Sequence, residues 1–455
     1  MATAKQRIWG WYFFDWASQP YNTLLLTFIF GPYFAEIARG YYMGNGMEEE
    51  AAKAVAQAYW GFGLTIASVA VALFAPILGA IADGTGRRLI WIWFFSLFYV
   101  VGATGLWWVT PGGEANMLLW AVTFFGIGFI GMEFATIFTN ALMPTLTDGD
   151  DIGKISGSGF AFGYLGGLLA LILMLTLFAE NSATGKTLIG LDPLFALDPE
   201  SREGTRAVGP FAAVWYVVFM IPFFLWVREP RTQRRPLRIA AAMGSLLELL
   251  RSLRFRRSLS SYLVSSLLYR DALNALYGFG GIYASNVLGW SITQIGVFGI
   301  LGAITAMLAS YAGGSLDKRV GPKPVIIASV VVLIIVCLVI VGLTRESVWG
   351  IPLDPASRMP DVIFYVCGAL IGAAGGPLQA ASRTMLVRHT TPDRATEAFG
   401  LFALSGKVAS FISPFLIALV SYYSESARIG ISPVILLFAI GLVLLIWVKP
   451  RGEMT

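Results

Sequence analysis

Long apolar runs separated by short polar segments are the main pattern along this chain. The runs are continuous rather than alternating, and most are close to the length of about 20 residues that an α-helix needs to cross a bilayer. The pattern therefore predicts an all-α membrane protein with twelve transmembrane helices. These cover residues 9–35, 59–82, 89–109, 117–143, 155–179, 208–227, 259–285, 293–315, 323–343, 361–382, 396–421 and 431–448.

Composition narrows the class of protein further. Of the 455 residues, 56% are hydrophobic and only 13% are charged, which is about half the charged share of a soluble domain. This excludes a soluble enzyme, a disordered chain and a nucleic-acid-binding domain. We expect a monomer with no nucleic-acid partner.

The distribution of basic residues predicts the orientation of the helices. Segments on the same side as the N-terminus hold 22 Lys and Arg residues, against 8 on the opposite side. Because cytoplasmic loops are enriched in Lys and Arg, both termini are predicted to be cytoplasmic. The chain has no Asn-x-Ser/Thr sequence, which favours a bacterial inner membrane over a glycosylating compartment.

Residues 228–258 separate the two halves and contain nine arginines. Four leucines share one face of a predicted helix and three arginines follow the other face: Leu246, Leu247, Leu250 and Leu253 against Arg251, Arg254 and Arg257. This pattern is typical of an amphipathic helix on the anionic inner leaflet, so anionic lipids are expected partners. A docking site for a regulatory protein is the alternative. The predicted domains are a six-helix bundle at 1–227, this linker, and a second six-helix bundle at 259–455.

An internal repeat supports the division into two halves. Residues 79–88 and 313–323 both carry Gly four positions before an Asp, followed by Gly and basic residues, and Asp83 and Asp317 lie 234 residues apart. A six-plus-six helix repeat accounts for this spacing.

The first copy, Gly-x-x-x-Asp-x-x-Gly-Arg-Arg at 79–88, resembles the loop 2–3 signature of the major facilitator superfamily. The second copy departs from it by one inserted residue. Segments 14–17, 155–167 and 399–407 resemble the "unknown major facilitator" branch related to the fungal autophagy-linked vacuolar amino-acid effluxer. The resemblance implies two bundles around a central cavity, a rocker-switch motion, and amino-acid-like substrates that are exported. It also implies gating residues that latch the cytoplasmic side, namely Asp83, Arg87, Arg88 and Asp317.

Polar residues within the apolar runs are the candidate site. A charge at mid-membrane is costly and usually faces a cavity or a partner. Polar positions recur at helical spacing on the first, fourth, seventh and tenth spans, as expected for helices that border a cavity. The candidate substrate- and proton-binding residues are Asp15, Gln19, Asn22, Glu133, Asn140, Arg270, Asp271, Asn274, Tyr277, Gln379, Arg383 and Lys407.

Different roles are expected within this set. Glu133, Asp271 and Asp15 are candidates for proton coupling, because a carboxylate in a low dielectric holds its proton more tightly. Arg270, Arg383 and Lys407 are candidates for an anionic group of the solute, and the amides and Tyr277 for orienting hydrogen bonds. Structural roles remain as alternatives: a cap or latch for Asp15, a cross-helix pair of Asp271 with Lys407, and a cytoplasmic anchor for Arg383.

The remaining spans show two other patterns. The third, sixth, ninth and twelfth are almost unbroken apolar sequence and should face lipid. The fifth, eighth and eleventh carry small residues that allow close helix packing, namely Gly159, Gly163, Gly167, Gly296, Gly299, Gly302, Gly400 and Gly406.

Other chemistry finds little support in the sequence. The single His389 and the two cysteines, Cys337 and Cys367, form no metal-binding cluster. The acidic run at 148–151 fits a helix N-terminus better than a metal site, and no phosphate-binding loop or nucleophile elbow occurs. We expect no cofactor and no catalytic site.

These patterns predict a secondary active transporter that moves a small polar or amphiphilic solute by alternating access, with proton coupling. The alternative is a receptor, scaffold or lipid-handling protein of the same fold that does not transport.

Overall fold

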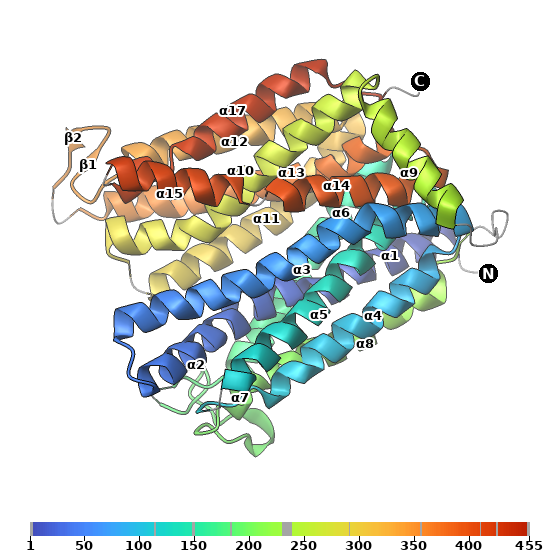
Figure 1. Cartoon of the computed structure of the whole chain (residues 1–455). Helices are drawn as coiled ribbons and strands as arrows, with labels where there is room; N and C mark the ends of the chain where they lie inside the picture. Colours follow the sequence, from blue (N-terminus) through green and yellow to red (C-terminus); the bar gives the residue numbers. More distant parts are fainter. Residues whose placement is uncertain are drawn as a thin grey trace. The chain divides into compact units, whose positions relative to one another are not determined.

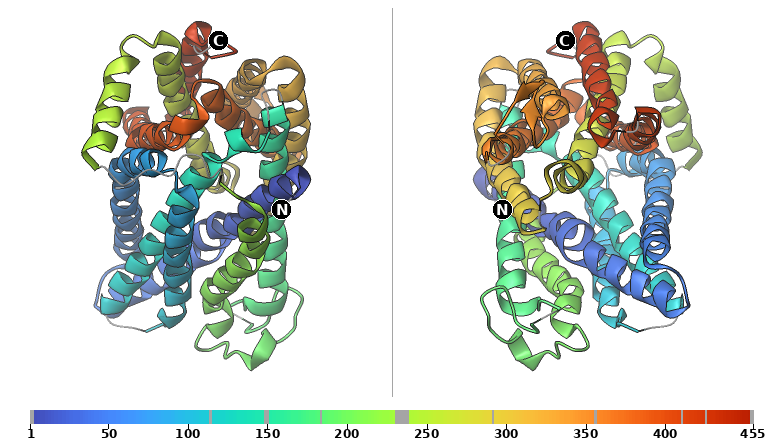
Figure 2. Two further views of the ribbon diagram at one scale, coloured as in Figure 1. Left: turned by 90° about the vertical axis from the view of Figure 1, so that its right-hand side faces the viewer. Right: turned by 90° about the vertical axis from the view of Figure 1, so that its left-hand side faces the viewer.

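The computed structural model describes residues 3–112, 115–147, 151–182, 184–229, 239–290, 292–354, 357–409, 411–424 and 426–452. The chain forms two compact units. Unit 1 comprises Met1–Ala75, Thr85–Leu142 and Phe162–Pro236, and unit 2 comprises Pro76–Gly84, Met143–Ala161 and Leu237–Thr455. Figures 1 and 2 show the helices of each unit from three sides.

Unit 1 is built from helices of the first half of the chain. They are α1 (Ala4–Pro20), η1 (Tyr21–Phe28), α2 (Phe30–Gly44), most of α3 (Glu49–Thr85), α4 (Arg88–Gly105), η2 (Leu106–Trp108), α5 (Ala115–Asn140), the second part of α6 (Ile152–Leu173), η5 (Met174–Phe178), η6 (Leu194–Ala196), α7 (Glu203–Arg206) and α8 (Val208–Trp226).

Unit 2 contains the end of α3, the start of α6 and the second half of the chain. Its elements are η3 (Met143–Thr145), α9 (Ile239–Leu253), α10 (Arg257–Leu288), α11 (Ile292–Val320), α12 (Pro322–Gly342), β1 (Ser347–Val348), β2 (Ile351–Pro352), α13 (Met359–Arg388), η8 (Pro392–Arg394), α14 (Ala395–Ala409), α15 (Ile412–Ser424), α16 (Ala427–Gly430), α17 (Pro433–Leu444) and η9 (Leu445–Trp447). The two short strands pair antiparallel, with Ser347 opposite Pro352.

The first membrane helix is longer and less regular than the sequence predicts. It begins at a capping box, in which the Thr3 side chain accepts from the Gln6 amide and the Gln6 side chain accepts from the Thr3 amide. The α-helical pattern ends at Pro20, which cannot donate to the helix. A π-helical segment follows, and Ile29 (φ −123°, ψ −64°) separates it from α2. The predicted span 9–35 is therefore the middle of a helical stretch from Ala4 to Gly44.

Close backbone contact between α4 and α5 organises one side of unit 1. A Cβ atom on Gly102 would overlap the backbone nitrogen of Gly128, and one on Gly131 would overlap that of Tyr99. Beside this seam the buried rings of Tyr99 and Tyr216 stack with centroids 3.9 Å apart. The Tyr216 hydroxyl lies 2.8 Å from the Ser96 hydroxyl. Small residues thus allow the approach, and aromatic rings fill the space behind it.

Unit 2 has a matching seam between α11 and α13, where a Cβ on Gly372 would overlap the Gly302 carbonyl and one on Gly376 the Ser310 hydroxyl. Helix α10 is fastened to α17 by side-chain hydrogen bonds. The Ser265 hydroxyl donates to the Gly441 carbonyl over 2.6 Å. The glycine contacts join α11 to α13, and the hydrogen bond joins α10 to α17.

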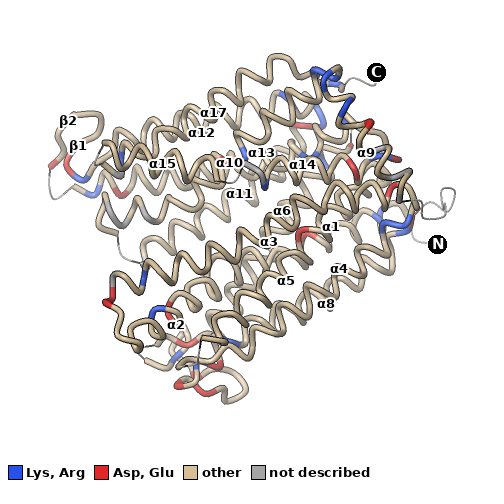
Figure 3. Tube along the Cα trace, in the orientation of Figure 1, with Lys and Arg blue, Asp and Glu red and all other residues tan. Residues whose placement is uncertain are grey.

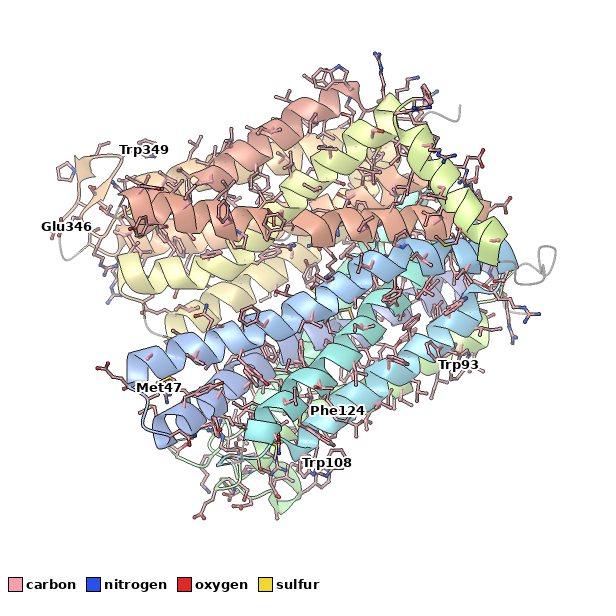
Figure 4. The ribbon with its side chains drawn as sticks, in the orientation of Figure 1. Met47, Trp93, Trp108, Phe124, Glu346 and Trp349 are labelled. Atoms are coloured by element: carbon pink, nitrogen blue, oxygen red, sulfur yellow. The ribbon has the colours of Figure 1, made fainter. Side chains whose placement is uncertain are left out.

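The outer surfaces of both units suit a bilayer. Large apolar side chains are exposed on α4, α8, α12 and α17, the helices predicted to face lipid. Trp93 and Trp108 project from the two ends of the α4–η2 stretch (Figure 4), where interfacial tryptophans of membrane proteins are found. Charged residues gather at helix ends and loops, with few along the helices (Figure 3).

Ten helical segments of the described chain are long and apolar enough to cross a membrane. The first helical stretch and α10 are not among them, since the first is broken near Pro20 and Ile29 and α10 carries many polar residues. The two exceptions are the first and seventh predicted spans, on which the sequence places polar stripes.

The linker helix is present with different bounds. The sequence predicts it at 246–257, but α9 ends at Leu253 and Arg257 already begins α10. Leu246 and Leu249 are buried against Ala80 and Leu401, whereas Leu247 and Leu250 are exposed. Part of the apolar face therefore packs on unit 2 rather than on a leaflet.

Candidate functional site

In unit 1 the polar stripe of α1 lies along α6. A Cβ on Gly163 would stand 3.2 Å from the Cβ of Asp15, and one on Gly167 would stand 2.8 Å from the Cγ of Gln19. The predicted glycine face of α6 thus packs directly on the candidate residues of α1. Among the other predicted packing glycines, Gly296 of α11 has no neighbour within 4 Å of its Cβ position.

The same stripe reaches α5, the second polar helix of unit 1. The Asn22 amide points to the sulfur of Met132 at 4.0 Å, and the Trp11 indole donates to the Thr139 carbonyl over 2.9 Å. Glu133 and Asp15 are half-buried, and Asn140 is 8% exposed. The first helical stretch, which carries Asp15 and Gln19 on α1 and Asn22 on η1, therefore contacts α5, which carries Glu133 and Asn140.

In unit 2 the guanidinium of Arg270 is held by contacts with Phe402 and Gly406. It stacks over the Phe402 ring, 3.9 Å from the centroid, and donates to the Phe402 carbonyl over 3.1 Å. Gly406, one turn further along α14, leaves the space, since a Cβ there would stand 3.1 Å from both terminal nitrogens of the guanidinium. A cation over an aromatic face is stabilised without a counter-charge.

Asp271 is buried beside it with a partner that the sequence does not indicate. Its carboxylate accepts hydrogen bonds from the amide and the hydroxyl of Ser413, over 2.8 and 2.6 Å. A pair of Asp271 with Lys407, which the sequence leaves open as an alternative, stays a prediction. Asp271 lies one position past Arg270, so it points to the start of α15, whereas Lys407 lies on α14.

The rest of the α10 stripe is open. Asn274 is exposed and Tyr277 is 45% exposed. The Tyr277 hydroxyl lies against Gly375 of α13, where a Cβ would overlap it. Gln379, one turn further along α13, is half-buried. Arg270, Asn274, Tyr277 and Gln379 therefore form one polar surface of α10 and α13.

Arg383 does not lie on this surface. It is 4% exposed, and its guanidinium donates to the hydroxyl and the carbonyl of Ser156, over 3.1 and 2.8 Å. The same group stacks over Phe160 at 4.0 Å. These contacts fit the anchor that the sequence leaves as an alternative to a solute-binding role.

A polar network between α10 and α13 is absent from the sequence-based list. The hydroxyls of Tyr262 and Tyr269 reach the carbonyl and the hydroxyl of Ser382, over 2.6 and 2.7 Å. The ring of His389 bonds through Nε2 to the Ser258 hydroxyl and through Nδ1 to the Met385 carbonyl. Both Tyr262 and His389 are fully buried. The sequence gives no sign of this role, because the partner Ser382 lies more than 100 positions away along the chain.

The predicted gating residues contact helix starts. In unit 2 the Asp83 carboxylate accepts from the amide of Glu397 over 2.8 Å, and Arg394 forms an ion pair with Glu397 at 2.9 Å. Asp317 is 1% exposed and lies over Gly153, where a Cβ would overlap its carboxylate. In both cases a carboxylate meets the first turn of a helix, where the helix dipole favours negative charge.

The basic gating residues lie in unit 1, at the start of α4. The Glu229 carboxylate caps this helix by accepting from the amides of Arg88 and Leu89. The Arg88 guanidinium donates to the Ala141 carbonyl over 3.3 Å, and Arg87 is exposed. Glu229 is not among the functional residues that the sequence predicts.

Metal-binding groups of three or more His, Cys, Asp or Glu side chains do not occur among the described residues. Asp148 and Asp150 of the acidic run lie outside the described residues. Cys337 and Cys367 are free, buried thiols.

Ten apolar helical segments of membrane length, together with polar side chains on α1, α5, α10 and α13, fit a membrane transporter, and the comparisons place it in the major facilitator superfamily. The solved proton:xylose symporter XylE has this fold, with a TM-score of 0.71 at 12% identity over 97% of this chain and 94% of that one. The chain belongs to the family described as "Vacuole effluxer Atg22 like", which matches residues 150–454.

Two relatives illustrate the range of this family. The chain is 25% identical over 96% of its length, and 94% of the relative's, to "Uncharacterized MFS-type transporter YxiO" of Bacillus subtilis. It is 22% identical over 61% of its length to "Autophagy-related protein 22" of Cryptococcus neoformans, and it spans 47% of that protein. The predicted resemblance and the twelve-helix fold are confirmed, and the Bacillus subtilis relative is named as a transporter rather than as an enzyme.

Proposed function

We propose that this protein is a proton-coupled secondary transporter that exports a small polar or amphiphilic solute, amino-acid-like in chemistry, by alternating access. The supporting observation is the polar surface that Arg270, Asn274, Tyr277 and Gln379 form on α10 and α13, two long helices of unit 2. A lipid-facing surface would not carry these groups. The family's description as an effluxer supports export.

Each polar group has a proposed task. Asp271, Glu133 and Asp15 carry the coupling proton, because a carboxylate within the membrane is most easily kept neutral. The naming of XylE as a proton symporter supports this coupling. Arg270 and Lys407 bind an anionic group of the solute. The side chains of Gln19, Asn22, Asn140, Asn274, Tyr277 and Gln379 supply hydrogen bonds that orient it.

Gating is proposed to use the helix starts. The bundles at 1–227 and 259–455, joined by 228–258, would be latched by Asp83 at the first turn of α14 and by Asp317 at the first turn of α6. The repeated sequence motif supports two equivalent latches. Breaking both would open the cytoplasmic side, with Arg87 and Arg88 at the start of α4 acting on the same loop.

The proposed setting is a bacterial inner membrane, with both termini in the cytoplasm and a monomer as the working unit. The relative in Bacillus subtilis supports a bacterial membrane. The excess of Lys and Arg on one side supports the orientation.

Flux measurements in proteoliposomes test this function. The vesicles are loaded with a mixture of neutral amino acids, and a pH gradient is imposed across the membrane. We expect flux that depends on the gradient for the parent and for Glu346→Gln, a matched control in the exposed loop before β1. Asp271→Asn and Glu133→Gln should abolish the dependence on the gradient. Flux in these two variants equal to that of the parent would refute proton coupling.

A ligand-stabilisation screen separates transport from the alternative of a receptor, scaffold or lipid-handling protein. A rise in the melting temperature with small solutes supports transport, because only a ligand that binds the folded state stabilises it. Stabilisation by anionic lipids alone, without flux for any solute, would support the alternative.

A further inference from the structure

The turn between α9 and α10 carries arginines that the proposed transport function does not use. Arg254 and Arg257 are both exposed. The Arg254 guanidinium lies over the ring of Phe255, 4.5 Å from its centroid. The described residues give neither guanidinium an ion pair with a carboxylate. Two cations that line the same surface thus remain available to an external anion.

These arginines stand at one end of a surface groove of about 600 Å³. The groove is lined by Leu253, Arg254, Arg257, Ser260, Ser261, Leu263, Val264, Leu444 and Trp447, with no carboxylate among them. The hydroxyls of Ser260 and Ser261 donate to the carbonyls of Leu253 and Leu444. The floor is therefore polar only at the basic end and apolar beyond it.

The groove is lined by residues of α10, of the end of α17 and of η9, and α10 packs against α17 (Figure 1). From Arg257 to Val264 the axis of α10 advances by about 10 Å. Val264 is 47% exposed, Trp447 is 57% exposed, and the next turns of α17 expose Val443 and Ile440. The apolar end of the groove thus continues into the lipid-facing surface of unit 2.

We propose that this groove binds an anionic phospholipid of the cytoplasmic leaflet. Its headgroup phosphate would lie between Arg254 and Arg257, since guanidinium groups match phosphate oxygens in a bidentate geometry. One acyl chain would lie over Val264 and Leu444, against the indole of Trp447, a side chain that favours the membrane interface. Exposed Phe255 at the turn adds apolar surface at the same level.

A second cavity on the other side of the turn has a different character. It measures about 560 Å³ and includes Arg256, Arg394 and Lys449 in its lining. Arg256 is engaged there by the His389 carbonyl at 2.8 Å, and Arg394 by Glu397 at 2.9 Å. Because Arg256 and Arg394 already have partners, this cavity is a weaker candidate than the groove for binding a lipid headgroup.

Native mass spectrometry of the full chain in detergent tests the lipid site. The probes are phosphatidylglycerol, phosphatidylcholine with the same acyl chains, and glycerol phosphate without chains. We expect the parent to retain phosphatidylglycerol at least tenfold better than either of the other two. Arg254→Gln/Arg257→Gln should weaken phosphatidylglycerol binding about tenfold or more, as expected for two arginines at an anionic surface.

The matched control is Arg319→Gln/Arg451→Gln, which removes two exposed arginines outside the groove. It should bind phosphatidylglycerol like the parent. Equal losses in both double variants would show a diffuse charge effect and overturn the site, as would equal retention of the two phospholipids by the parent. If glycerol phosphate binds as tightly as phosphatidylglycerol, the site accepts a soluble anion and the lipid assignment is overturned.

Folding of the variants is checked by their melting temperatures in phosphatidylcholine. If Arg254→Gln/Arg257→Gln melts early, Trp447→Ala serves as the second variant. It leaves both arginines in place and should reduce retention of phosphatidylglycerol through the loss of chain contact. Unchanged retention in Trp447→Ala would also overturn the site. Transport activity plays no part in these readouts, so this site and the proposed function fail independently.

Discussion

At the scale of single residues, Arg270 illustrates how a charge is held inside a membrane helix. Its guanidinium needs the Phe402 ring on one side and the bare backbone of Gly406 on the other. Both contacts fix the position of the guanidinium on α10. Gly406 therefore leaves room for the Arg270 guanidinium. This role differs from the helix-packing role that the sequence predicts for it.

We expect Gly406→Val to displace the Arg270 guanidinium and to abolish solute flux, because a branched side chain would occupy the position of its terminal nitrogens. The cation–π contact it disturbs is worth about 1–2 kcal/mol, so the melting temperature should also fall. Gly296→Ala is the control, since no atom lies within 4 Å of its Cβ position, and it should behave like the parent. Full flux in Gly406→Val would contradict a role of the Gly406 contact in holding Arg270.

Ser413 offers a second test at this scale. Its hydroxyl donates to the buried Asp271 carboxylate over 2.6 Å, and hydrogen bonds to charged groups contribute about 1.5–3 kcal/mol. Ser413→Ala should therefore lower the free energy of unfolding by about 1–3 kcal/mol. Ser424→Ala, on the same helix, removes bonds to the uncharged carbonyls of Val420 and Ser426 and should change it by under about 0.5 kcal/mol. Equal effects in denaturant titrations would argue against the Asp271 contact.

At the scale of elements, the α4–α5 seam is the tightest test of packing in unit 1. Gly131→Ala should destabilise the protein by about 1–3 kcal/mol or more, because the added methyl meets the backbone of Tyr99 rather than a movable side chain. Gly126→Ala lies on the same helix, with Ala67 Cβ at 3.8 Å as its nearest neighbour, and should be neutral. The melting temperatures of the two variants are compared in the same detergent. A lower melting temperature for Gly126→Ala than for Gly131→Ala would refute the close packing of α4 on α5.

The elements also show what the sequence can and cannot predict. Apolar length predicts the spans, because each helix must satisfy its own backbone in lipid. The polar stripes of α1, α5 and α10 are predictable for the same reason, since each polar residue stands out against an apolar background. The seam of Gly102 with Gly128 was not predicted, because a close approach depends on which helices face each other. The Ser413 partner of Asp271 and the Ser156 partner of Arg383 were missed for that reason too.

At the scale of the whole molecule, the orientation in the membrane is predicted from charge alone. The excess of 22 to 8 Lys and Arg residues predicts that the loop before β1 faces outward and α9 faces the cytoplasm. Glu346 and Glu248 are exposed positions in these two segments. The native thiols, Cys337 and Cys367, are buried and should react little.

Single cysteines at these positions test the orientation. In intact cells a membrane-impermeant maleimide should label Glu346→Cys and leave Glu248→Cys unlabelled, whereas both should react once the membrane is opened. Labelling of Glu248→Cys alone in intact cells would reverse the predicted orientation. It would also move the groove of Arg254 and Arg257 to the outer leaflet, because α9 and the start of α10 are joined by a turn of three residues. The orientation of the chain therefore decides which leaflet can supply the proposed lipid.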